Sequence, residues 1–209
     1  MMRVRLPDRP GSLGAVATAL GTAGADINAI EIVERGPGFA INDFMLTMPP
    51  GALPDTLITA CTGLDGVSVL WLSRYPENWG LASDIDTLNR MTAEPGRALQ
   101  ILTEAAPHVF HSQWALLLSP ERAIETASGL APVDEPGSRV DVSWCNLLAP
   151  LDVPHSGELP DQWLPGWGET TVAVAPAARG RTVVLGRQGG PEFLESELRR
   201  LAHLAALAL

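Results

Sequence analysis

Apolar residues in the first third of the chain switch between a two-residue spacing and a helical spacing. Val4 and Leu6 alternate with Arg3 and Arg5, which predicts a half-buried strand. The segments that follow repeat the two patterns in turn. The predicted elements are a strand at 3–6, a helix with a stripe at Leu13, Val16, Ala17 and Leu20 that ends at Gly21 and Gly24, strands at 25–34 and 39–48, a helix at 53–64 and a strand at 65–73.

The order of these elements is βαββαβ. It is the order of the split βαβ, ferredoxin-like arrangement, in which two helices cover one face of a four-stranded antiparallel sheet. The other face of such a sheet has to be covered or solvated.

A second set of patterns follows the Pro/Gly-containing linker 74–83, so we expect two domains, at 1–75 and 84–209. This second half predicts an α/β domain with a central antiparallel sheet, which makes the fold class α+β. Its predicted elements are a helix capped by Ser83 and broken at 94–96, a helix ending near Ala106, strands at 112–119, 122–128 and 139–148, a hairpin of 169–176 and 181–187, and a closing helix within 189–209 with a stripe at Leu194, Leu198, Leu201, Ala205 and Ala208.

Composition narrows the function classes. The formal charge of -10 argues against a nucleic-acid partner, and the basic residues are all arginines, which excludes lysine Schiff-base chemistry and a phosphate-loop lysine. No apolar run approaches the roughly 20 residues that span a bilayer, and the first residues lack the apolar core of a signal peptide, so we expect a cytoplasmic protein with no membrane partner. Cys61 falls on a helical apolar face and Cys145 in a strand pattern, and both indicate structural residues.

The turn "DRPGSL" at 8–13 is the strongest candidate site. Pro10 and Gly11 turn the chain into a helix whose first N–H groups suit a ligand carboxylate. Asp8, Asp26 and Asn28 offer acceptors for a ligand ammonium group. The alternative is that the turn only serves the fold, with Asp8 capping the helix.

Residues 4–73 resemble the ACT domain, a small regulatory module of amino-acid metabolism, through the run "DRPGSLGAVATALGTAGADINAIEI". The resemblance implies edge-to-edge pairing into a homodimer and a small ligand, typically an amino acid, at the seam. The family often has Asn where this chain has Asp26, so an amine-bearing ligand group is expected there. The implied ligand-binding residues are Asp8, Arg9, Pro10, Gly11, Ser12, Leu13, Asp26, Ile27 and Asn28.

The second half resembles a GAF domain less closely, through "SQWALLLS" and the hairpin and helix of 171–208. Such domains bind small molecules or dimerise, and nothing in the sequence specifies a cofactor.

Other residues point to no catalytic or metal site. His108 and His111 lack a third ligand nearby, and Trp163 and Trp167 indicate either an aromatic pocket or a hydrophobic plug. No catalytic Ser-His-Asp elbow, zinc motif or nucleotide loop occurs. We therefore expect a non-enzymatic regulatory or sensor protein without metal or cofactor; the alternatives are a structural dimerisation subunit that binds no ligand and an enzyme that uses the Trp-rich region.

Overall fold

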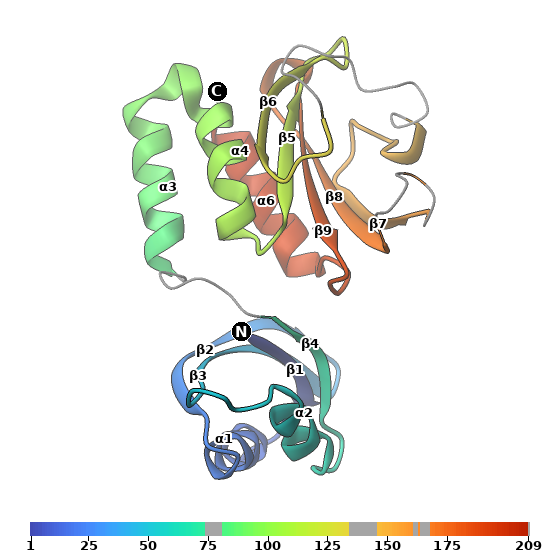
Figure 1. Ribbon diagram of the computed structural model, residues 1–209. Helices are drawn as coiled ribbons and strands as arrows, with labels where there is room; N and C mark the ends of the chain where they lie inside the picture. Colours follow the sequence, from blue (N-terminus) through green and yellow to red (C-terminus); the bar gives the residue numbers. More distant parts are fainter. Residues whose placement is uncertain (74–80, 134–145, 161–162, 164–167, 209) are drawn as a thin grey trace. The chain divides into compact units, whose positions relative to one another are not determined.

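The computed structural model describes residues 1–73, 81–133, 146–160, 163 and 168–208. The chain divides into two compact units, Met1–Pro76 and Glu77–Leu209, which we call the N-terminal and the C-terminal unit. Each unit has its own antiparallel sheet and its own helices (Figure 1). The fold class is therefore α+β, as the sequence predicts. No described helix has the length and hydrophobicity of a membrane-spanning segment.

The N-terminal unit has the predicted βαββαβ order. Its sheet has the strand order β2-β3-β1-β4, and β3 is antiparallel to both β1 and β2. Two helices cover one face of this sheet (Figure 1). The elements are β1 (Met2–Pro7), α1 (Ser12–Thr22), β2 (Asp26–Gly36), β3 (Phe39–Thr47), α2 (Asp55–Thr62) and β4 (Ser68–Leu72).

The core of this unit follows the predicted faces, except that Leu13 of the predicted helix stripe is exposed. Val4 and Leu6 of β1 pack with Val16 and Leu20 of α1 and with Phe44 of β3, and all five are buried. Helix α1 ends through Gly24, whose φ of 87° is left-handed, whereas Gly21 lies inside the helix. The backbone N–H of Ala25 donates to the carbonyl of Leu20 at 3.0 Å, which closes the last turn in the manner of a Schellman motif.

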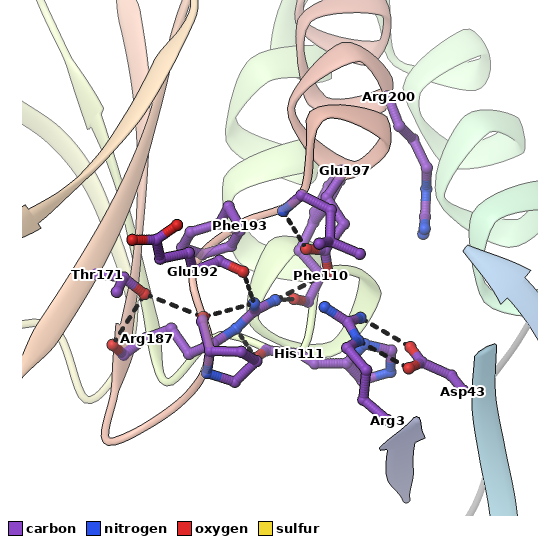
Figure 2. Close-up of polar contacts among 12 residues, drawn as sticks. Arg3, Asp43, Phe110, His111, Thr171, Arg187, Glu192, Phe193, Glu197 and Arg200 are labelled. Atoms are coloured by element: carbon purple, nitrogen blue, oxygen red, sulfur yellow. Dashed lines mark hydrogen bonds and ion pairs between the residues drawn. The ribbon is translucent and has the colours of Figure 1, made fainter. Parts of the chain in front are cut away.

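The opposite face of the same sheet carries a bidentate ion pair. Arg3 of β1 and Asp43 of β3 are direct partners in the strand register, and Nε and Nη2 of Arg3 each donate to one carboxylate oxygen at 2.7 Å (Figure 2). Arg5 lies over the ring of Phe39, with Cζ 4.3 Å from the ring centroid. The two arginines that alternate with Val4 and Leu6 thus have separate partners on this face.

The C-terminal unit is built on a five-stranded antiparallel sheet of order β6-β5-β9-β8-β7. Helices α4 and α6 pack on the sheet, and α3 packs on α4 (Figure 1). The elements are α3 (Leu81–Ala93), a 3₁₀ turn η1 (Pro95–Arg97), α4 (Ala98–Val109), β5 (Trp114–Leu118), β6 (Ile124–Gly129), β7 (His155–Leu159), β8 (Thr170–Pro176), a 3₁₀ turn η2 (Ala178–Gly180), β9 (Thr182–Gln188) and α6 (Glu195–Leu207).

Both faces of the central strands are buried, which explains their nearly continuous apolar sequences. Ala115 and Leu117 of β5 face the helices, while Trp114, Leu116 and Leu118 lie in a second cluster on the other face. Trp163 packs at the border of that second cluster, with its ring centroid 6.0 Å from that of Trp114. The hydrophobic-plug interpretation thus fits Trp163; Trp167 lies outside the described residues.

Several boundaries in this unit differ from the predictions. Ser83 lies inside α3, which begins at Leu81, so it does not cap the helix. Helix α4 does not end before Pro107 but continues to Val109. A proline has no N–H for the carbonyl four residues earlier, here Thr103, and that carbonyl instead accepts the hydroxyl of Ser128 at 2.6 Å. The predicted strand 139–148 falls mostly outside the described residues, and β7 was not predicted.

Candidate functional site

The turn between β1 and α1 is exposed and leaves the helix start without a side-chain cap. Gly11 is the N-cap residue, with φ 91° and ψ -21°, and no side chain hydrogen-bonds to the first turn. Asp8 therefore does not cap the helix; its own N–H donates to the carbonyl of Gly38 at 3.2 Å. The N–H of Ser12 donates to the carbonyl of Arg9, also at 3.2 Å. Asp8, Arg9, Pro10 and Leu13 are exposed, and Ser12 is half-buried.

The other predicted ligand residues begin β2. Asp26 and Asn28 are exposed, while Ile27 borders the hydrophobic core. The amide nitrogen of Asn28 donates to the hydroxyl of Thr47 at 2.8 Å. This bond fixes the amide group and leaves its oxygen as an acceptor.

Within one chain these two groups of residues lie at opposite ends of the sheet. The strand register places Pro7 beside Phe39 but Asp26 beside Thr47. Those partners are eight residues apart on β3, which corresponds to about 26 Å at 3.3 Å per residue. Asp8 and Asp26 of a single chain are therefore too far apart to contact the same small ligand. The reason is the crossover: α1 runs antiparallel to β1 and returns the chain to the end of the sheet where β1 began.

A buried arginine with a complete set of hydrogen bonds was not predicted from the sequence. Arg187 of β9 is fully buried, and its five N–H donors all have acceptors (Figure 2). Nε donates to the carbonyl of His111 at 3.1 Å, and Nη2 to that of Phe110 at 2.8 Å and to Glu197 Oε1 at 3.0 Å. Nη1 donates to the carbonyls of Pro191 and Glu192 at 3.1 and 3.4 Å.

The remaining contacts of this cluster show that it holds elements together. Cζ of Arg187 lies 4.0 Å from the ring centroid of Phe193, and Oε2 of Glu197 accepts the N–H of Leu194 at 2.8 Å at the start of α6. The guanidinium group therefore joins the end of α4, strand β9 and the start of α6. The arginine after Gly186 was visible in the sequence, but its partners come from segments that only the fold brings together.

The other candidate side chains have structural surroundings. His108 lies in the last turn of α4, and His111 follows that helix in a left-handed conformation, with φ 51°. Across the part of the chain that the structure describes, no three His, Cys, Asp or Glu side chains are close enough to hold a metal ion. Cys61 is buried in the core of the N-terminal unit, as predicted, and burial raises the pKa of its thiol. Cys145 lies outside the described residues.

Comparisons with known proteins bear on both units. Residues 1–56 match the family model of the ACT domain. No curated protein matches the sequence. Among solved structures, the chain is similar to the "GAF domain of a putative sensor histidine kinase from Pseudomonas syringae pv. tomato", with 18% identity over 61% of this chain and 81% of that chain and a TM-score of 0.40.

The likeness to that GAF domain adds nothing to what the sheet order and packing of the C-terminal unit already establish. The family match, in contrast, covers the turn, the crossover helix and the first three strands of the N-terminal unit. The element order of the N-terminal unit agrees with this sequence match. The N-terminal unit thus matches the ACT domains, a family of regulatory modules that bind small ligands.

Proposed function

We propose that the N-terminal unit binds an amino acid or a related small metabolite at a seam between two copies of the chain, and that the protein is a regulatory sensor without enzymatic activity. The observation that carries this proposal is the separation, along β3, of the two groups of predicted ligand residues. One group is the turn at 8–13 and the other is the start of β2 at 26–28, and we call each of them a half-site. Neither half suffices for a ligand with both a carboxylate and an ammonium group. A second copy supplies the missing half.

The edge strand β2 provides the means of pairing. It is an 11-residue strand at the edge of its sheet, and Ile30 and Ile32 on it are 38% and 46% exposed. Unpaired edge strands with apolar side chains favour pairing with another strand. Closed dimers generally have two-fold symmetry. A two-fold axis perpendicular to the sheet runs the second copy of β2 antiparallel to the first, so Asp26 of one copy lies at the end of the sheet where Gly11 of the other begins α1.

The chemistry of the two halves is complementary to an amino acid. The N–H groups in the first turn of α1 and the helix dipole stabilise a carboxylate. Asp26 and the amide oxygen of Asn28, from the second copy, accept hydrogen bonds from an ammonium group. This pairing removes the difficulty of having Asp26 beside a ligand carboxylate, because the charge of Asp26 is directed to the ligand's amine.

One observation favours the second candidate function, a dimerisation unit without ligand. Gly11 has a left-handed φ, so the fold itself requires a glycine in this turn, whether or not a ligand approaches it. Such a unit would also pair through the edge strand β2. The two candidates therefore differ in ligand binding and agree on the dimer.

The first experiment separates these two functions. Light scattering measures the oligomeric state, and a thermal-shift screen covers the twenty amino acids. A dimer that one amino acid stabilises supports the sensor. The expected gain in the free energy of unfolding is about 2.7 kcal/mol at a ligand concentration of 100 Kd. A dimer with no stabilising amino acid leaves the dimerisation unit, and a monomer at tens of micromolar contradicts both candidates.

Mixing two variants tests the seam itself. Leu13→Glu places a carboxylate in the exposed first turn, where it repels a ligand carboxylate and suits the helix dipole, and Asp26→Ala removes the ammonium partner. Each variant alone should lose binding of the amino acid found in the screen by tenfold or more, with the fold intact. Heterodimers in an equal mixture have one intact site out of two, so about a quarter of the wild-type sites should return. No recovery in the mixture would show that both residues act within one chain.

A further inference from the structure

A cavity of about 460 Å³ lies at one end of the five-stranded sheet of the C-terminal unit. The β5–β6 turn at 119–123 and the β8–β9 turn at 177–181 both line it, and β5 and β9 are neighbouring strands, with Leu118 beside Thr182. Loop 149–152 forms another wall. Three prolines, Pro120, Pro150 and Pro176, contribute apolar and conformationally restricted surface.

Each of the two turns has an arginine in a conformation that ordinarily selects glycine. Arg122 has φ 64° and Arg179 has φ 61°. In the first turn, the N–H of Ser119 donates to the carbonyl of Ala123 at 2.8 Å and the N–H of Arg122 donates to that of Ser119 at 2.9 Å. A left-handed conformation is unfavourable for residues with a Cβ atom. The turn requires this backbone conformation, which glycine adopts more readily than arginine. The backbone therefore does not explain why position 122 has an arginine side chain.

The charges around the cavity leave Arg122 available. Arg181, which also lines the cavity, has an ion pair with Glu125 at 3.5 Å. The carboxylate of Glu121 accepts the hydroxyl of Ser119 at 3.0 Å. Among the described residues, the guanidinium group of Arg122 has no hydrogen bond or ion pair. Asp152 lines the loop wall of the same cavity.

We propose that this cavity binds a small phosphate monoester with an apolar body, held by Arg122 and Arg181. A guanidinium group binds phosphate oxygens through two parallel N–H bonds. Arg122 is available for this contact, and Arg181 supplies a second guanidinium group at the cavity while it keeps its ion pair with Glu125. The prolines pack on the apolar body. Asp152 accepts a hydrogen bond from a hydroxyl or an amine on that body and repels a second anionic group. The site belongs to the C-terminal unit and is independent of the function proposed for the N-terminal unit.

The test uses the full-length chain and phenyl phosphate as the probe, followed by NMR titration of the backbone amide signals. We expect millimolar or tighter binding that shifts the signals of both turns. Inorganic phosphate should bind more weakly, because it lacks the apolar body, and phenol, which lacks the anion, should not bind. Equal affinity for phosphate and phenyl phosphate would refute the role of the apolar walls, and binding of phenol would refute that of the arginines.

Two glycine substitutions form a matched pair. Arg122→Gly and Arg179→Gly both relieve a left-handed arginine, so both should keep or raise the melting temperature. Of these two arginines, Arg122 lines the cavity and Arg179 does not. Arg122→Gly should therefore weaken phenyl phosphate binding by about tenfold or more, and Arg179→Gly should leave it nearly unchanged. The proposal is overturned if the wild-type chain does not bind phenyl phosphate, or if Arg122→Gly binds it as tightly as the wild-type chain.

Discussion

Replacing Arg187 by methionine should destabilise the C-terminal unit more than any substitution at the surface. Methionine has a comparable length and no donors, so the change removes five hydrogen bonds and leaves the carboxylate of Glu197, 6% exposed, without its cation. Four backbone carbonyls lose a donor at the same time. The perturbation thus affects α4, β9 and α6 together.

The expected loss in the free energy of unfolding depends on which of these changes costs most. A hydrogen bond to a charged group contributes about 1.5–3 kcal/mol, but five of them cannot be added, because carbonyls at the rim regain water. Removing one partner of a buried ion pair costs about 3–5 kcal/mol, mostly from the charge left behind. We expect a loss of this size, which is a large part of the roughly 5–15 kcal/mol that stabilises a domain.

Urea denaturation followed by tryptophan fluorescence measures this loss, because five of the six tryptophans lie in the C-terminal unit. Arg187→Lys is the control for charge alone: it keeps the cation but not the planar fork, so it should lose less than Arg187→Met. The double variant Arg187→Met with Glu197→Gln should be more stable than Arg187→Met alone, because a neutral amide then replaces the buried carboxylate that has lost Arg187. A loss below about 1 kcal/mol, or additive effects in the double variant, would refute this account of the cluster.

Three further predictions concern the N-terminal unit. Gly11→Ala should destabilise it by about 1 kcal/mol, because φ is 91° there, whereas Gly14→Ala inside α1 should stabilise it by a similar amount; thermal denaturation of both variants checks the pair, and equal effects would contradict the backbone argument. Cys61, in a Cys145→Ser background, should react with a thiol reagent only at the rate of unfolding, because it is buried. Burial raises the pKa of the Cys61 thiol, so the unfolded chain ionises first and stability should fall as the pH rises above the ordinary thiol pKa, a fall that a Cys61→Ala variant should lack.

The N-terminal fold could be predicted from the sequence because its signals are local. Alternation in β1, the stripe on α1 and the left-handed Gly24 are each properties of a few neighbouring residues. The candidate site could not be assembled in the same way. Closeness in sequence and the family resemblance place the turn and the start of β2 in one group, whereas the direction of α1 decides which residues lie at the same end of the sheet.

In the C-terminal unit, the differences arise where a distant partner overrides a local rule. Pro107 usually marks the end of a helix, but Ser128 from β6 satisfies the carbonyl that it leaves unpaired, so α4 continues. From the sequence alone, Arg187 is a polar residue at the end of a strand. In the fold it is bonded to Phe110, Glu192 and Glu197, which come from other segments. Neither set of contacts can be predicted from the residues that neighbour Pro107 or Arg187 in the sequence.

The direction of α1 underlies the proposed seam site, and that site would have a consequence for the protein concentration at which a ligand binds. A binding site divided between two chains exists only in the dimer, so its occupancy depends on the amount of protein as well as on the amount of ligand. By thermodynamic linkage, a ligand that binds at the seam tightens the dimer by the same free energy with which the dimer favours the ligand. Dilution below the dissociation constant of the dimer should therefore release the ligand, and a rise in expression should raise the apparent affinity with no change in any residue.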